Sequence, residues 1–152
     1  MEIGYEVILS FILIGYIATI GTIYFLSPTK KWDKFPEKCT VKTKCTRVAD
    51  YNCRGYKLKP IEIEDSVKNV QTKIIEIVNS KPRMKIINEM LGFIHATDVT
   101  PFLRFYDDIA IKLFEENGKT IVWMQSQSRL GYYDFQVNEK RIQELHKDFL
   151  LI

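Results

Sequence analysis

The chain has 152 residues, which suits one modest domain together with a short accessory segment. Its net charge is only +3, and this excludes the strongly basic class of nucleic-acid-binding proteins. The charge is unevenly distributed along the chain. The stretch from Lys30 to Lys59 holds ten Lys or Arg residues and three acidic ones, a net charge of +7, so the remaining residues together carry −4. The basic stretch directly follows an apolar segment, where anionic lipid headgroups would attract it; a solvated, lysine-rich linker is the equal alternative.

Residues 7–26 form an uncharged apolar run that as a helix would cover roughly 30 Å, the thickness of a hydrocarbon core. A cleaved signal peptide is the competing interpretation. Against it, Glu2 and Glu6 precede the run in place of basic residues, and no small-x-small cleavage site follows it. Three aromatic residues flank the run at interfacial positions: Tyr5, Tyr24 and Trp32. The sequence therefore predicts a single transmembrane anchor over residues 1–26.

The charges on the two flanks of this anchor predict its orientation. Four lysines follow the run within about fifteen residues, whereas no Lys or Arg precedes it, and basic residues near a span are retained on the cytosolic side. These lysines are Lys30, Lys31, Lys34 and Lys38. We therefore expect the C-terminal domain on the cytosolic side. The cysteines argue for the opposite side, since disulfides are rare in the cytosol, but they can also stay reduced.

Residues 27–60 are predicted to form a linker arm, because prolines punctuate them and apolar periodicity is weak. The arm contains every cysteine of the chain: Cys39, Cys45 and Cys53. Three thiolates could hold zinc, but no CxxC pair and no nearby histidine accompany them, so we expect no metal site. Cys53 is left either as a free thiol or as a link to a partner.

Residues 61–152 carry the pattern of an α+β domain. Apolar residues recur at helical spacing over 63–78, and four strand-like runs follow before a last helix over 138–149, which Asn138 would cap. The runs span residues 84–88, 93–99, 102–114 and 120–128. Short connections, including an Asn-Gly turn, join them as hairpins. The order α-β-β-β-β-α predicts an antiparallel four-stranded sheet covered on one face by two helices, after the transmembrane helix.

A polar turn between the last strand and the last helix carries a family resemblance. It reads Ser126-x-Ser128-Arg129-x-Gly131-Tyr132-x-Asp134-x-x-Val137-Asn138-x-x-Arg141, which resembles the signature of the DUF1499 family, a group of small domains of unknown function. The resemblance covers roughly residues 39–149. It implies a disulfide between Cys39 and Cys45, worth about 2 kcal/mol in an oxidising compartment. It also implies relatives in bacteria, plastids and large DNA viruses, and the layout would suit a viral membrane protein beneath a capsid.

Strand alternation places Asp107 at the edge of the helix-covered core, where a carboxylate needs a partner. Arg129 and the turn amides near Gly131 are the obvious partners. The wider polar cluster comprises Asp107, Asp108, Arg129, Gly131, Asp134, Asn138 and Arg141. It either locks the strand-to-helix turn or lines a small cleft for an anionic ligand, and we favour the architectural role because buried carboxylate–guanidinium pairs usually have one.

The other face of the sheet would display too many aromatic residues for an idle solvated surface. They are Phe93, His95, Tyr106, Phe114 and Trp123. This face could dock a protein partner, or the N-terminal arm could fold across it; the two alternatives weigh equally.

No residue pattern indicates an enzyme or a bound cofactor. Ser126 and Ser128 lack a nucleophile elbow, and neither histidine sits in a base or metal motif. Two functions remain. The first is a membrane-anchored structural or interaction protein that docks partner proteins at a bilayer, such as a minor capsid-to-membrane protein of a virion. The second is a small-ligand-binding or hydrolytic module with a cleft around Arg129 and Asp107. A polar pocket above about 300 Å³ would favour the second.

Overall fold

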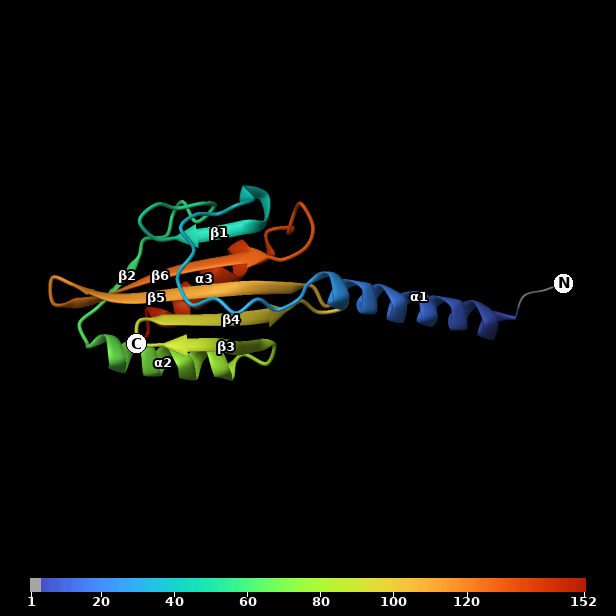
Figure 1. Cartoon of the computed structure of the whole chain (residues 1–152), viewed down its shortest axis with the longest axis horizontal. Helices are drawn as coiled ribbons and strands as arrows, with labels where there is room; N and C mark the ends of the chain where they lie inside the picture. The colour runs from blue at the N-terminus through green and yellow to red at the C-terminus, as the bar shows by residue number, and fades with distance from the viewer. Residues whose placement is uncertain (1–3) are drawn as a thin grey trace.

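The computed structural model describes residues 4–152 as one long N-terminal helix followed by an α+β domain (Figure 1). Helix α1 spans Tyr5–Leu26 and is long and apolar enough to cross a membrane. The hydroxyl groups of its serine and threonines, at Ser10, Thr19 and Thr22, donate to carbonyls four residues earlier. These polar groups are thereby satisfied within the helix, whose surface stays apolar on every side. Glu2, which precedes the apolar run within the predicted anchor, lies outside the described residues.

The domain contains six strands, not the four that we expected, in an antiparallel sheet of order β1-β6-β5-β4-β3, with β2 also paired to β6. The strands are β1 (Cys45–Val48), β2 (Ile61–Ile63), β3 (Met84–Met90), β4 (Phe93–Val99), β5 (Tyr106–Glu116) and β6 (Lys119–Ser128). The prediction missed β1 and β2 because they have only four and three residues. Strands that short cannot show a hydrophobic period, and Ile63 of β2 had been assigned to the following helix.

Both α-helices of the domain pack on one face of the sheet, and a short 3-10 helix, η1 (Lys42–Lys44), is a further helical element that we did not expect. Helix α2 spans Val67–Ser80 and is capped by Ser66, whose side chain accepts a hydrogen bond from the backbone amide of Asn69. Helix α3 spans Val137–Phe149. Their buried residues meet those of the central strands in one core, which includes Val70, Ile74, Val78, Ile94, Ile109, Ile111, Val122, Met124, Ile142, Leu145 and Phe149. In Figure 1, α3 is seen behind β5 and β6, and α2 runs along the edge of the sheet next to β3. The alternation along β5 therefore puts Ile109 and Ile111 inside and leaves their neighbours on the opposite face.

The arm that follows α1 covers much of that opposite face, crossing in front of the strands in Figure 1. The ring of Trp32 stacks on His95 of β4 with centroids 4.8 Å apart. The ring of Phe35 lies 6.0 Å from that of Trp123 on β6. The alternative in which the arm folds across the aromatic face is thus correct for this part of the sheet. His95 is fully buried as a result.

The loop between β4 and β5 closes on itself before β5 begins at Tyr106, four residues later than expected. The amide of Thr100 donates to the carbonyl of Phe105, and the amide of Phe105 donates back to the Thr100 hydroxyl. Phe102 and Arg104 have positive φ angles of 62° and 56°. A strand cannot pass through residues in this left-handed conformation, so the apolar run over 102–105 forms a loop.

Candidate functional site

Two polar clusters lie on opposite faces of the sheet, both at the end of the domain where α1 joins. On the core face, Arg141 of α3 reaches back to the strands. Its Nη2 donates to the Asp107 carboxylate at 2.7 Å, and its Nε donates to that of Asp98 at 2.8 Å. Its Nη1 donates to Ser126 and Asn138. The side chains of all three charged residues are almost fully buried. A fully paired guanidinium between two carboxylates holds α3 against β4 and β5.

This arrangement corrects the predicted pairing of Arg129 with Asp107. Consecutive residues of a strand point to opposite faces, and Asp107 and Asp108 are neighbours on β5. Arg129 follows β6 on the face away from the helices, so it reaches Asp108 and not Asp107. The partner of Asp107 is Arg141, which the family signature had included without a role.

The side chain of Asp134 caps the N-terminal end of α3, a role that we had assigned to Asn138. Its carboxylate accepts the backbone amides of Gln136 and Asn138, at 3.1 and 3.2 Å. Gln136 occupies the N-cap position in a left-handed conformation. Asn138 lies inside the helix and is buried, and its side chain bonds Ser126, Ser128, Asp134 and the Lys44 carbonyl. Asn138 therefore joins α3 to the sheet. Gly131 stands before them in the turn with φ of 78°, as expected for a backbone reversal.

A second arginine, Arg54 of the arm, completes the binding of Asp134. Its Nη1 lies 2.8 Å from the Asp134 carboxylate and also donates to the carbonyl of Thr43. Burial of Asp134 opposes its charge, but the hydrogen bonds from Arg54 and Asn138 prevail and lower its pKa. The pair ties the arm to the start of α3.

On the opposite face, Asp108 accepts hydrogen bonds from two residues. Arg129 donates through Nε and Nη2 at 3.0 and 2.8 Å, a bidentate pair, and the Nε2 atom of His95 lies 2.9 Å away. Burial acts to raise the pKa of Asp108, but these bonds outweigh it and the pKa is lowered. Arg129 also uses Nη1 to bind the carbonyl of Ser27 and the hydroxyl of Thr29. It thereby fixes the end of α1 to the domain.

His95 has no ring nitrogen left for catalysis. The backbone amide of Trp32 donates to its Nδ1 at 3.2 Å, so Nδ1 is the acceptor and the proton lies on Nε2, facing Asp108. The stacked Trp32 ring covers the imidazole. The pair of His95 and Asp108 therefore supports the arm and does not form a base open to a substrate.

A pocket of about 440 Å³ opens beside Arg129, between the end of α1, the arm and β6. Three cations and one carboxylate line it: Lys30, Lys44, Arg129 and Asp108. Its apolar lining comes from Leu26, Pro28, Trp32 and Val41. Since Asp108 is already paired with Arg129, the ammonium groups of the two lysines supply the uncompensated charge. The pocket suits a small molecule that combines an anionic group with an apolar part.

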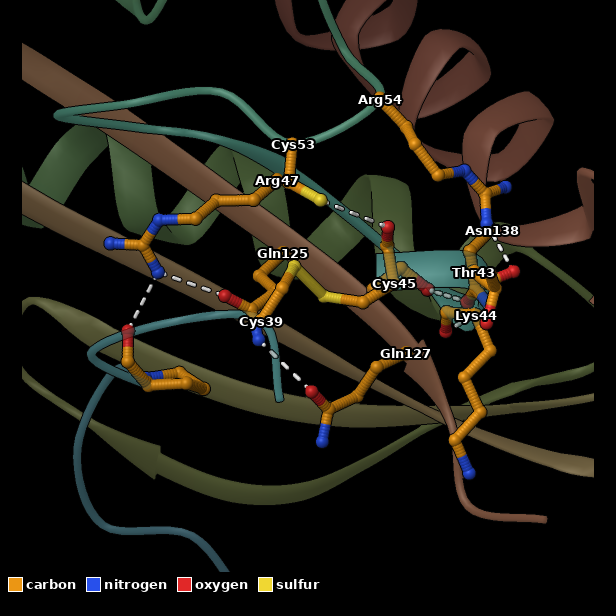
Figure 2. Close-up of a disulfide and its surroundings, with 12 residues drawn as sticks. Cys39, Thr43, Lys44, Cys45, Arg47, Cys53, Arg54, Gln125, Gln127 and Asn138 are labelled. Carbon is orange, nitrogen blue, oxygen red and sulfur yellow. Dashed lines mark hydrogen bonds between the residues drawn. A yellow bond between two sulfur atoms is a disulfide. The ribbon is translucent and has the colours of Figure 1, made fainter. Parts of the chain in front are cut away.

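The Cys39–Cys45 disulfide joins the segment before β1 to the first residue of β1 (Figure 2), and Cys45 also lines this pocket. Beside it, Arg47 of β1 donates to the Pro36 carbonyl at 2.6 Å and to the side chain of Gln125 at 2.8 Å. Cys53 is a free, buried thiol, and burial raises its pKa. The arm is therefore held by covalent, ionic and stacking contacts. Among residues 4–152, no group of three His, Cys, Asp or Glu side chains is placed to hold a metal ion.

The aromatic residues of the opposite face divide into two groups. Phe93 and His95 are buried, and Tyr106 contacts α1 through Tyr24, with ring centroids 6.3 Å apart. Phe114 and Trp123 pack edge-to-face at 5.0 Å near the far end of the sheet, where they stay half-buried.

Sequence reasoning missed Arg47, Arg54 and Asp98. Asp98 had a signal, since it continues the inward alternation of Ile94 and Ala96 along β4. The two arginines had none, because each lies in the arm and finds its partners only when the arm folds over the sheet.

These features define a small α+β domain, with an antiparallel sheet and two helices on one face, carried on a single apolar N-terminal helix. Residues 37–149 match the family described as Protein of unknown function (DUF1499). The chain belongs to this family, and the resemblance seen in the sequence is confirmed. No curated protein matches the chain.

Proposed function

We propose that this protein is a single-pass membrane protein whose domain binds a small anionic ligand in the pocket beside Arg129. The position of that pocket is the observation that supports this function most directly. It lies against Leu26 and Ser27, where α1 ends, so its basic lining would stand at the headgroup level of the bilayer that α1 crosses. The volume of the pocket, about 440 Å³, lies within the range of roughly 300–1,000 Å³ that is typical of ligand sites.

The charge and shape of the pocket narrow the ligand class. Lys30 is exposed and Lys44 is half-buried, and neither forms an ion pair within residues 4–152. The Lys44 ammonium donates to the Arg129 carbonyl at 3.2 Å, which holds it at the pocket. Two ammonium groups without a carboxylate partner, beside a tryptophan ring, suit a phosphate or carboxylate that carries an apolar group. Hydrolysis is not part of the proposal, because the histidine nearest to the pocket has both nitrogens occupied.

Titration of the full chain in neutral phosphatidylcholine nanodiscs tests this function. Trp32 lines the pocket, so its fluorescence in a Trp123→Phe background reports occupancy. We expect saturable binding of a short-chain phosphatidate, weaker binding of inorganic phosphate, and loss of both when Lys30 and Lys44 are replaced by Gln. Lys112→Gln, on the distant part of the same face, is the matched control. Equal responses from both sets of variants would refute the site.

Docking of protein partners is the second candidate function, and the aromatic pair Phe114 and Trp123, which the arm covers only in part, favours it. Phe114 and Trp123 stay half-buried at the end of the domain away from α1, with the Lys112 ammonium 4.7 Å above the Trp123 ring. A structural role between a membrane and a capsid would belong with this function. Crosslinking in intact membranes or particles should then recover a partner from the wild type and lose it in Trp123→Ala.

The orientation of the domain is a further part of the proposal. The lysines that follow α1 favour the cytosolic side, whereas the Cys39–Cys45 disulfide favours an oxidising compartment. We propose the cytosolic side, since ion pairs and Trp32 also hold the arm without the disulfide. Protease added to sealed vesicles with the external face outward should leave the domain intact. Its digestion there would overturn the orientation.

A further inference from the structure

Two loops at the α1 end of the domain expose apolar side chains to the surroundings. One loop, residues 100–105, joins β4 to β5, and the other, residues 129–136, joins β6 to α3. The exposed side chains, with their exposed fractions, are Phe102 (82%), Leu103 (42%), Tyr132 (79%), Tyr133 (51%) and Phe135 (79%). Four aromatic residues and a leucine concentrated in two short loops form a surface that water does not favour.

The backbone of both loops is built to present these rings. Phe102 and Phe135 have φ angles of 62° and 51°, a left-handed conformation that is rare for bulky residues and costs free energy. Each loop is also fixed at its base. The Thr100–Phe105 hydrogen bonds close the first, and the Asp134 carboxylate, held by Arg54, anchors the second. Two of the four exposed rings, those of Phe102 and Phe135, therefore belong to residues in a strained conformation.

Direct contacts place these loops beside α1. The Tyr16 hydroxyl donates to the carbonyl of Phe102 at 2.7 Å, and Tyr24 contacts Tyr106, the first residue of β5. Arg129, which opens the second loop, binds the Ser27 carbonyl at the end of α1. Figure 1 shows both loops at the end of the domain that α1 enters, with the hairpin turns of β3–β4 and β5–β6 at the opposite end.

The charges at this end are basic. Arg104 and Lys30 are exposed there, and Lys44 is half-buried. The carboxylates of the same region, Asp108 and Asp134, are buried in ion pairs with Arg129 and Arg54. Apolar aromatic tips with a basic surround match the interface of a membrane that contains anionic lipids.

We propose that the two loops insert their aromatic side chains into the leaflet in which α1 ends, so that the domain stands on the bilayer and is not suspended from a flexible tether. This surface depends on the membrane anchorage of the proposed function but not on ligand binding in the pocket. The bilayer is the occupant because the Tyr16–Phe102 contact makes the first loop continuous with the helix that enters it. Arg129, which opens the second loop, binds the Ser27 carbonyl where α1 ends, so this loop also lies at the end of the domain that α1 enters.

Lipid quenching of site-specific labels tests the insertion. The full chain, with Cys53→Ser to remove the free thiol, receives single cysteines at Phe102 or Phe135 that carry an environment-sensitive fluorophore. Vesicles of phosphatidylcholine and phosphatidylserine contain spin-labelled lipid as the quencher. A label at Phe11 inside α1 is the positive control, and one at Leu91, exposed on the far β3–β4 turn, is the negative control.

We expect the labels at positions 102 and 135 to shift to the blue and to be quenched like the label at position 11, with position 91 unaffected. Quenching at position 11 alone would overturn the insertion while leaving the anchor intact. Absence of quenching at position 11 would overturn the anchor and the insertion together, and would leave the loops as a surface for a protein. Phosphatidate binding in the pocket, measured on the same samples, is a separate readout.

Discussion

Removal of the Arg141 guanidinium should destabilise the domain more than removal of any exposed arginine. Arg141 bonds Asp107 and Asp98, whose side chains are only 1% and 4% exposed. In Arg141→Ala, both carboxylates would stay buried without this partner, a change that costs about 3–5 kcal/mol. This is at least about a fifth of the typical stability of a domain, roughly 5–15 kcal/mol. Urea unfolding of the full chain in detergent, followed by tryptophan fluorescence, measures the difference.

Arg83→Ala is the matched control, since Arg83 lies 3.6 Å from the same Asp98 but its side chain is 56% exposed. The loss there should be about 0–1 kcal/mol. Combination of Arg141→Ala with Asp107→Asn should recover part of the stability, because the stranded charge is removed. Equal losses in Arg141→Ala and Arg83→Ala, or additive effects of the first with Asp107→Asn, would refute the buried network.

The same reasoning predicts the pH dependence of the Arg141→Ala deficit. Burial already raises the pKa of Asp107, although the Arg141 charge opposes this shift. A carboxyl whose folded pKa is raised favours folding below its unfolded value of about 3.8, and this contribution is lost as the pH rises through the folded pKa. Without Arg141 the pKa rises further. The deficit should therefore be largest at neutral pH and shrink as the pH falls.

Three more outcomes follow from the arm and its contacts. The fragment 27–152 should be soluble and folded by circular dichroism, because the main core between the sheet and helices α2 and α3 contains no residue of α1; an aggregated fragment would contradict this. Cys39→Ser should lose about 2 kcal/mol relative to the oxidised chain and nothing relative to the reduced one, as compared by urea unfolding with and without dithiothreitol. The pKa of Asp108 is lowered in the folded state, so this carboxylate stabilises the fold at pH values above its unfolded pKa of 3.8, and the stabilisation is lost as the pH falls through its folded pKa. Asp108→Asn should therefore make the free energy of unfolding less dependent on pH at acidic pH. An unchanged acid dependence would show that Asp108 makes no such contribution.

Elements with a clear period or a specific turn were predictable from the sequence. The alternation over residues 93–99 gave β4 with its observed bounds, and Asn117-Gly118 adopts the expected positive φ angles in the β5–β6 hairpin. The apolar spacing of Val70, Ile74 and Val78 gave α2 and its buried face. In each case the local pattern and the tertiary packing favour the same structure.

The arm could not be predicted in this way, because its structure comes from contacts distant in sequence. The Arg47 side chain donates a hydrogen bond to Gln125, which lies 78 residues later in the sequence, and the Trp32 amide donates to His95, 63 residues later. β1 forms a strand because its backbone pairs with the edge of β6. For the candidate site, the residue types were identified but their pairing was not. Asp107 and Asp108 differ by one position, and which arginine each binds depends on the sheet face from which that arginine approaches.

A photocrosslinking amino acid in place of Val41, which lines the pocket, tests the ligand-binding account most directly. The full chain is irradiated in native membranes, and the mass of the adduct is measured; a variant labelled at Phe114, at the far end of the sheet, serves for comparison. We predict that the photocrosslinking residue at position 41 captures a small acidic molecule or lipid. Substitution of both lysines, Lys30→Gln with Lys44→Gln, should abolish this adduct. A protein adduct at Val41, unaffected by the lysine substitutions, would contradict it.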